Sequence, residues 1–275
     1  MRTMITHSDY GEVSQFLMGK EINGKVLYSM AVYYVDGLLI DTGPKTVTEE
    51  ARNIFQNIQV KKVVNTHHHE DHIGNNLYFQ EKGIPIFAHD LAVPLINQPS
   101  MWISRLLEYQ KLVWGTPPAS ISNPIGDSIK GNKYKFKVIH TPGHSLDHIC
   151  LLEEKNGWLF AGDMFLGEKV KLLRSDENVN LSMASLTKLL DYEFDTIFCC
   201  SGRVFDNAKQ CVSDKLSWWK ILYQQTIQMA EQGYDATVIR DKLLGEENAL
   251  AQLTEGDMSK LNLIQSFLSS FPQNN

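Results

Sequence analysis

Four histidines and two acidic residues occupy six consecutive positions of this sequence, inside the segment Asn65 to Gly74. The segment reads NTHHHEDHIG. Imidazole and carboxylate groups are the ligands that bind zinc, iron and manganese in proteins. Burying them together without a metal ion would be costly, because strongly polar groups would be forced into contact. The segment therefore predicts a metal-binding site.

The spacing within the segment indicates which side chains share a direction. His67 and His69 are two residues apart, so in an extended chain they point the same way. Asp71 and His72 follow and face a different direction, which suits a second metal ion. The residues that alternate with these ligands, His68 and Glu70, are expected to face the other way.

Two later segments each place one further ligand at the end of a predicted strand. The strand over 134–140 runs into a turn that contains His144, and the strand over 158–161 ends at Asp163. Ligands gather at the carboxyl ends of strands in layered α/β proteins. We therefore expect both side chains to meet the histidine segment at one edge of the fold.

The combined ligands divide into two predicted sites. The first site has three nitrogen ligands and one position left for water, as in a catalytic zinc site, from His67, His69 and His144. The second site would be formed by Asp71, His72 and Asp163. With Asp163 as a bridge, two ions could act together on one carbonyl or phosphoryl oxygen.

Strands and helices alternate in the elements that must position these residues. Strands are predicted over 12–20, 26–35, 37–41, 60–65, 84–88, 134–140, 149–152, 158–161 and 196–200. Helices are predicted over 47–58, 73–82, 101–114, 182–190, 207–232, 235–244 and 256–270. Units of strand, loop and helix of this length indicate a layered α/β fold. The proline-rich stretch over 90–125 is either a lid over the site or simple packing.

Composition limits the classes of function that fit. The chain has 275 residues, an apolar fraction of 43% and a net charge of −6, which gives no support to binding nucleic acid or an anionic membrane. No apolar run approaches 18 residues, and we see no signal peptide. The four cysteines show no CxxC spacing. We expect a reduced protein in the cytoplasm.

Several motifs together resemble those of the metallo-β-lactamase superfamily. Residues 66–74, THHHEDHIG, fit the motif T-H-x-H-x-D-H-x-G, and residues 141–145, TPGHS, fit T-P-G-H-[ST]. Residues 159–163, LFAGD, fit the strand that ends in a bridging aspartate, and residues 38–43, LLIDTG, are similar to an early strand of the family. The resemblance covers about residues 12–205.

The resemblance implies an α/β fold, a four-layer αββα sandwich with a dinuclear metal site at one edge. It implies a metallo-β-lactamase-like domain over 1–205, with a C-terminal helical extension over 206–275 packed on it. That extension would complete the substrate pocket or support a homodimer.

One departure from the family concerns the second metal. The family usually supplies a last histidine after the final strand, whereas residues 199–204 here read CCSGRV and no histidine follows His148. We therefore expect weaker occupancy of the second site, or a mononuclear working form. Two interpretations of Arg203 stay open. It is either a fixed cation that orients a substrate carboxylate or phosphate, or a loop residue that faces solvent.

The predicted activity is a zinc-dependent hydrolase with one or two ions, although iron or manganese would also fit. The substrate would be a small ester-like molecule, such as a thioester of the glyoxalase II type or a lactone. A metal-bound hydroxide would attack it, with Asp71 holding or accepting the proton. A phosphodiesterase and a mononuclear iron oxidoreductase of the persulfide dioxygenase type remain as alternatives. The predicted partner is a small-molecule substrate, with no nucleic acid and no membrane.

Overall fold

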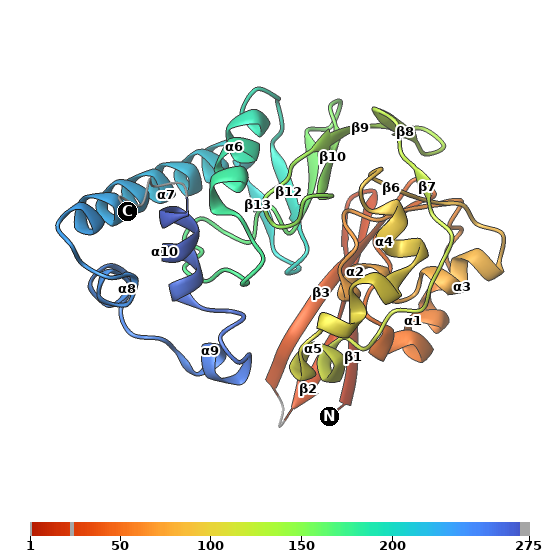
Figure 1. Ribbon diagram of the computed structural model, residues 1–275. Helices are drawn as coiled ribbons and strands as arrows, with labels where there is room; N and C mark the ends of the chain where they lie inside the picture. Colours follow the sequence, from red (N-terminus) through yellow and green to blue (C-terminus); the bar gives the residue numbers. More distant parts are fainter. Residues whose placement is uncertain (1, 23–24, 270–275) are drawn as a thin grey trace. The chain divides into compact units, whose positions relative to one another are not determined.

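The structure, a computed structural model, describes residues 2–22 and 25–269 and divides the chain into two compact units. The first unit comprises Met1–His140, Asp147–Asp163 and Phe194–Asp206. The second unit comprises Thr141–Leu146, Met164–Glu193 and Asn207–Asn275. Both β-sheets belong to the first unit, and the helices from α6 onward belong to the second (Figure 1).

The larger sheet has seven strands in sequence order. They are β1 (Arg2–Tyr10), β2 (Val13–Ile22), β3 (Lys25–Val35), β4 (Leu38–Ile40), β5 (Lys62–Val64), β6 (Ile86–Ala88) and β7 (Asn123–Pro124). Pairing is antiparallel from β1 to β4 and parallel from β4 to β7. The β3–β4 turn has positive φ at Asp36 (56°) and Gly37 (84°), as a two-residue hairpin turn requires.

The smaller sheet has six strands, in the order β13-β12-β11-β10-β9-β8. They are β8 (Ser128–Lys130), β9 (Lys135–His140), β10 (Ile149–Glu153), β11 (Trp158–Gly162), β12 (Thr196–Cys199) and β13 (Val204–Asp206). Only the β11–β12 pair is parallel among the described pairings of this sheet. The parallel pair matters for the site because the carboxyl ends of both strands lie at the same edge.

Alternate residues of the larger sheet face two different cores. Tyr33 of β3 packs with Phe160 and Phe198 of the smaller sheet, so one core lies between the two sheets. The neighbouring Val32 packs instead with Phe55 and other residues of the helices after β4. The period of two therefore builds three layers within the first unit, namely helices, sheet and sheet. Figure 1 shows these helices on the outer side of β3.

The helices of the first unit are short. They are η1 (Lys45–Val47), α1 (Thr48–Phe55), α2 (Glu70–Ile73), α3 (Asn76–Glu81), α4 (Val93–Asn97), η2 (Pro99–Met101), η3 (Ile103–Arg105) and α5 (Glu108–Val113). The predicted helix over 101–114 is wrong in its first half. Trp102 (φ −137°) and Leu106 (ψ 130°) leave the helical region, and both side chains enter a buried cluster with Ile73 and Ala88. Burial of these two side chains outweighs the helical periodicity.

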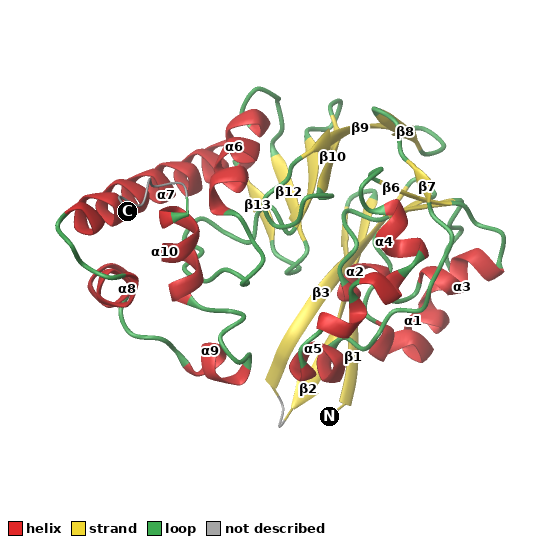
Figure 2. Ribbon diagram, viewed as in Figure 1, coloured by secondary structure: helices red, strands yellow, loops and turns green. Residues whose placement is uncertain are grey.

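The second unit is helical (Figure 2). Its helices are α6 (Val179–Leu189), α7 (Ala208–Glu231), α8 (Ala236–Leu244), α9 (Ala249–Leu253) and α10 (Lys260–Leu268). Side-chain caps at Asn178, Asp235, Asn248 and Ser259 fix four of the starts. The helix predicted over 256–270 begins later, at Lys260, and residue 270 lies outside the described residues. The predicted packing of a 206–275 extension on a 1–205 domain stays a prediction.

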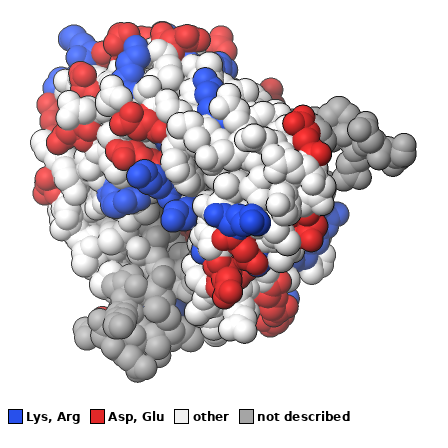
Figure 3. Space-filling view, turned by 90° about the vertical axis from the view of Figure 1, so that its left-hand side faces the viewer, with Lys and Arg blue, Asp and Glu red and all other residues white. Residues whose placement is uncertain are grey.

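The surface carries charges of both signs. Lys and Arg side chains lie beside Asp and Glu side chains on the face shown in Figure 3, in line with the 26 basic and 32 acidic residues of the chain. Among helices within residues 2–22 and 25–269, none has both the length and the apolar character needed to cross a membrane.

Candidate metal centre

The histidine segment follows β5 and runs into the short helix α2. His69 is extended (φ −62°, ψ 154°) and precedes the first helical residue. The rings of His67 and His69 lie together, with centroids 4.5 Å apart, as the spacing of two predicts. The ring of His72 approaches His67 from the helix, at 4.0 Å between centroids.

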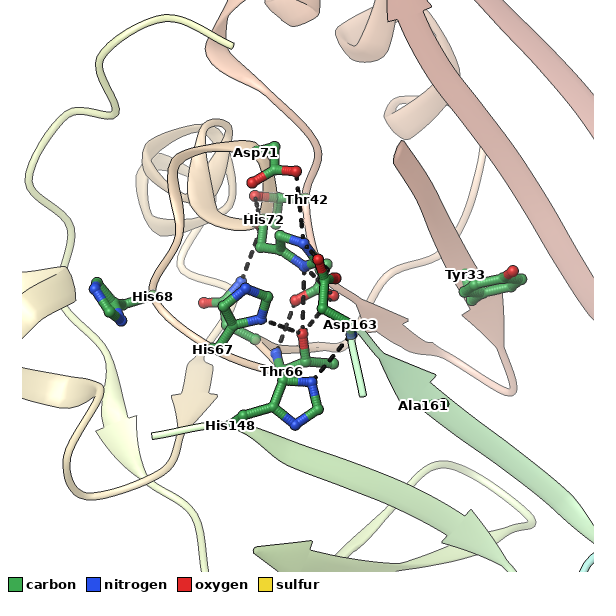
Figure 4. A network of polar contacts seen from close by, with 12 residues as sticks. Tyr33, Thr42, Thr66, His67, His68, Asp71, His72, His148, Ala161 and Asp163 are labelled. Atoms are coloured by element: carbon green, nitrogen blue, oxygen red, sulfur yellow. Dashed lines mark hydrogen bonds and ion pairs between the residues drawn. The ribbon is translucent and has the colours of Figure 1, made fainter. Parts of the chain in front are cut away.

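A carboxylate from the smaller sheet completes this group. Asp163 directly follows β11, and its Oδ1 lies 3.0 Å from Nε2 of His72. Oδ2 of Asp71 is 3.7 Å from the same nitrogen. Ligand atoms of His67, His72 and Asp163 all lie within 4.8 Å of one another. Figure 4 shows these side chains converging from separate elements.

His72 supplies the observation that tests whether a metal ion fits. The side chain is completely buried, and its Nε2 makes no hydrogen bond although a carboxylate oxygen lies 3.0 Å away. A buried imidazole nitrogen is normally satisfied by a partner. Imidazole and carboxylate donors also match the ligand set of zinc, iron and manganese. The residues present therefore fit a metal ion.

Asp41 fixes the orientation of His72 from the opposite side of the ring. Its Oδ2 lies 2.8 Å from Nδ1 of His72 and accepts the Thr66 hydroxyl at 2.9 Å. Its Oδ1 accepts the backbone N–H of Thr66 at 2.8 Å. A carboxylate on Nδ1 sets the tautomer and directs Nε2 toward a metal. Asp41 has a left-handed backbone (φ 63°), which aspartate tolerates better than most residues.

The electrostatics of this group favour a cation. Burial by itself would lower the pKa of His72, but the nearby carboxylates of Asp41, Asp71 and Asp163 outweigh it and raise that pKa well above the ordinary value. The same negative field that holds a proton on His72 would attract a metal ion in its place.

A layer of amide and hydroxyl groups holds the backbone of α2. The carbonyl of His72 accepts the N–H of Thr42 at 2.8 Å. The Thr42 hydroxyl donates to Asn76 at 3.0 Å, and Asn76 donates to Asn65 at 2.8 Å. The motifs indicate no role for Thr42, Asn65 or Asn76, although Thr42 lies within residues 38–43 and Asn65 directly precedes residues 66–74.

His148 and Gly162 fix the backbone of Asp163. The N–H of Asp163 donates to Nε2 of His148 at 3.1 Å. A Cβ at Gly162 (φ 48°) would lie 2.6 Å from that nitrogen, so only glycine allows this close approach. His148 therefore holds the segment that carries a predicted ligand.

The residues that alternate with the predicted ligands point elsewhere. Nδ1 of His68 lies 3.0 Å from Asp147, and the ring packs against Trp102 at 5.1 Å between centroids. Figure 4 shows His68 turned away from His67, as the spacing predicts. Glu70 is buried and accepts a hydrogen bond from Gln110 at 2.8 Å. That bond ties α2 to α5, in the stretch interpreted as lid or packing.

His144 lies in the second unit, where a carboxylate also orients it. Its Nδ1 is 3.3 Å from Oε2 of Glu177, whose other oxygen accepts the N–H of Arg174 at 3.0 Å. The turn is fixed to α6 by a bond from Ser185 to the Pro142 carbonyl, at 2.7 Å. Nothing in the local sequence around Glu177 indicates this contact. The predicted grouping of His144 with His67 and His69 stays a prediction.

The segment after β12 lacks the expected histidine. The Arg203 side chain is exposed, with its guanidinium carbon 5.0 Å from the centre of the Phe205 ring, which favours the loop interpretation. Cys200 is buried. A hydrogen bond to Cys199, burial and the charge of Asp163 raise the pKa of the Cys200 thiol well above its ordinary value.

The sequence matches a known protein family and several of its members. A family model described as the metallo-beta-lactamase superfamily matches residues 28–201. A relative from Aquifex aeolicus, an uncharacterized protein, is 30% identical over 168 residues, which span 60% of this chain and 77% of the relative. A hydroxyacylglutathione hydrolase of Photorhabdus laumondii is 30% identical over 138 residues, 50% of this chain and 45% of that enzyme.

A solved structure gives the same fold. A metallo-beta-lactamase family protein from Thermus thermophilus superposes with a TM-score of 0.66 and 16% identity, covering 92% of this chain and 91% of that one. The predicted α/β sandwich with C-terminal helices is thereby confirmed. The chain spans less than two thirds of the length of several curated relatives that it matches.

Proposed function

The chain belongs to the metallo-beta-lactamase superfamily, and from that premise we propose that it is a metal-dependent hydrolase of a small ester-like substrate, first of all a thioester. The group of His67, His72 and Asp163, in which both histidines are buried, carries the proposal, since its ligand atoms are close enough for one ion to bind them together. A bound zinc, iron or manganese ion would lower the pKa of a water molecule and polarise the ester carbonyl.

Asp71 and Asp41 have separate roles in the proposed reaction. Asp71 faces Nε2 of His72 at 3.7 Å and is partly exposed, so its carboxylate can receive the proton of an attacking water. Asp41 keeps His72 in one tautomer throughout, because its Oδ2 stays on Nδ1. Burial of the surrounding groups excludes water from these contacts and strengthens them.

His144 is proposed as the third nitrogen ligand beside His67 and His69. Glu177 directs its ring through Nδ1, which is how a ligand histidine is usually oriented. Chain length supports the grouping. Asp147 accepts the backbone N–H of His68 at 2.8 Å, and His144 is three residues from Asp147, hence within about 11 Å of it along the chain.

The choice of a thioester rests on the relatives. One of them is a hydroxyacylglutathione hydrolase, whose name describes hydrolysis of a thioester. The active-site chemistry alone suits thioesters, lactones and phosphodiesters equally, because each reaction stabilises negative charge on an oxygen beside the metal. The substrate class is therefore the part of the proposal that an assay must decide.

The test is metal analysis followed by a substrate panel. Protein purified without added metal would be analysed for zinc, iron and manganese, then assayed on thioester, lactone and phosphodiester substrates. We expect bound metal, with thioester hydrolysis lost on chelation and restored by metal. Turnover of the phosphodiester alone would overturn the substrate class. One iron per chain with oxygen-dependent turnover would overturn hydrolysis itself.

A further inference from the structure

A buried aspartate of the C-terminal segment holds the turn that carries Glu177. Asp257 is 7% exposed, and its Oδ1 accepts the backbone N–H of Ser175 at 3.2 Å and the Ser175 hydroxyl at 2.6 Å. Its Oδ2 lies 3.6 Å from Nε of Arg174. Burial of an aspartate is costly unless such partners compensate it. Both carboxylate oxygens of Asp257 therefore face one turn, residues 174–177.

This turn is closed on itself and presents Glu177 to His144. The N–H of Glu177 donates to the Arg174 carbonyl at 3.3 Å, and the N–H of Arg174 donates to Oε1 of Glu177 at 3.0 Å. The other oxygen, Oε2, is the one that lies 3.3 Å from Nδ1 of His144. The backbone of the turn therefore sets the position of the Glu177 carboxylate, and a shift at Arg174 or Ser175 would move its contact with His144.

Backbone and hydroxyl bonds hold the two sides of the turn against the C-terminal segment. The N–H groups of Leu173 and Ser259 each donate to the other residue's carbonyl, both at 3.1 Å, as in a short antiparallel pair. On the other side, the N–H of Val179 donates to the hydroxyl oxygen of Ser266 in α10, at 2.9 Å. The turn is thus bonded to the C-terminal segment just before it and just after it, and Asp257 holds its middle.

The backbone of Asp257 is itself fixed by a local turn. After α9, left-handed backbone at Glu255 (φ 52°) and Gly256 (φ 86°) reverses the chain. The N–H of Asp257 donates to the Thr254 carbonyl at 2.9 Å, and the side-chain amide of Asn262 in α10 donates to the Asp257 carbonyl at 2.6 Å. The carboxylate of Asp257 is therefore presented from a backbone that is held on both sides.

We infer that Asp257 is a positioning residue for His144 and acts through the turn and Glu177. The inference rests on the metal-dependent function proposed above, in which His144 is a ligand. A carboxylate that orients a ligand imidazole contributes to metal affinity, and here a second carboxylate holds the first one in place. The C-terminal segment thereby contributes to metal binding without supplying a ligand.

Zinc binding in a double-mutant cycle tests the inference without relying on activity. Full-length protein would be stripped of metal and titrated with zinc in competition with a chelator, as wild type, Asp257→Ala, Glu177→Ala and the double variant. We expect Asp257→Ala to weaken binding of the first zinc equivalent about threefold to tenfold, below the roughly 10–100-fold typical of groups that contact a ligand directly. The double variant should bind zinc as Glu177→Ala does, because no carboxylate remains to be positioned.

A second aspartate of the same unit provides the control for stability. Oδ1 of Asp235 likewise accepts two hydrogen bonds, from the N–H groups of Thr237 and Val238 at the start of α8. Asp235→Ala should lower the urea midpoint of the metal-free protein and leave its zinc affinity unchanged. A loss of zinc affinity in Asp257→Ala alone would therefore reflect positioning of Glu177 and not a general loss of stability.

Two milder variants protect the test against misfolding of Asp257→Ala. Ser175→Ala, at an exposed residue, removes only the 2.6 Å bond and should weaken zinc binding about twofold. Asp257→Asn keeps an oxygen that can accept both bonds from Ser175, so it should bind zinc within about twofold of wild type. Ser175→Ala decides the question if Asp257→Ala fails to fold.

Two results would overturn the inference and leave the hydrolase proposal standing. One is wild-type zinc affinity in both Asp257→Ala and Ser175→Ala, beside metal-dependent turnover in the wild type. The other is a pair of losses that multiply in the double variant, which would show that Asp257 acts independently of Glu177. A wild-type protein that binds neither zinc, iron nor manganese would overturn both proposals.

Discussion

Two groups of histidines occur in the first unit, and each contains a histidine paired with an aspartate. The inner group is His67, His72 and Asp163, with Asp41 behind His72. The outer group is His68, His89, His140 and Asp147. Nδ1 of His72 lies 2.8 Å from Asp41, and Nδ1 of His68 lies 3.0 Å from Asp147. On that contact alone the two pairs are alike.

The groups differ in what surrounds the imidazoles. Carboxylates outweigh burial at His72 and raise its pKa, whereas burial and then His140, stacked 4.1 Å away, lower the pKa of His89. A third carboxylate, Asp163, faces the free edge of His72, while the ring of His68 packs against Trp102. An aspartate that contacts a histidine ring therefore does not by itself identify that histidine as a metal ligand. The distinguishing feature is a carboxylate on the far edge of the ring, Asp163.

The largest expected effect comes from removing the Asp163 carboxylate. Asp163→Ala should lose at least one equivalent of metal and more than about 100-fold in hydrolysis, beyond the 10–100-fold that is typical of changes behind a ligand. Metal analysis and kcat/KM measure both. Asp147→Ala, in the outer group, should retain its metal. Full metal content in Asp163→Ala would remove the distinction between the groups.

A smaller effect is expected from replacing Asp41 and Asp147, the two aspartates that contact Nδ1 of a histidine. Asparagine keeps the shape and tolerates the φ of 63° at residue 41, but its amide cannot accept every bond that Asp41 accepts. Asp41→Asn should weaken metal binding about 10–100-fold, measured by competition with a chelator. Asp147→Asn should lower stability by about 1–3 kcal/mol through its buried partners and leave metal affinity unchanged. Equal losses of affinity would contradict the comparison.

Glu177→Gln tests a supporting carboxylate of the second unit. Its contact with Nδ1 of His144, at 3.3 Å, is longer than the contact of Asp41 with His72. We expect metal affinity or kcat/KM to fall about tenfold, which is the lower limit for replacing a group that orients a metal ligand. Urea unfolding of the metal-free protein serves as the control for stability. A loss greater than that of Asp41→Asn would reverse the proposed ranking of the two supports.

The smallest effect concerns pH and the outer group. Burial lowers the pKa of His89 below the ordinary 6.5, so the unfolded chain binds more protons near and below that pH. His89 therefore costs stability as pH falls below about 6.5. Metal-free wild type should lose more stability than His89→Gln between pH 7.5 and 5, measured by urea unfolding. Parallel curves for the two proteins would show that His89 is not responsible.

The strongest sequence signals come from residues whose spacing and chemistry agree. The spacing of His67 and His69 gives their shared direction, and the glycine-aspartate end of β11 gives the position of Asp163. Periodicity also locates most strands of the two sheets. These features are local, so a single sequence carries them.

What the sequence does not show depends on contacts between distant residues. Strand β1 reads RTMITHSDY, which is polar, yet it pairs with β2 along its whole length. Glu177 contacts His144, which lies 33 positions earlier in the chain. Tertiary contacts decide such cases.

The contact between His72 and Asp163 joins residues 91 positions apart, one in α2 after β5 of the larger sheet and one directly after β11 of the smaller sheet. Closing so long a loop is slow and entropically costly, and it requires the two sheets to dock first. The cluster therefore does not exist in the unfolded chain or in either sheet alone. A metal ion bound there should slow unfolding while leaving the rate of folding almost unchanged. Metal binding at the cluster would therefore stabilise the folded protein kinetically, after folding is complete.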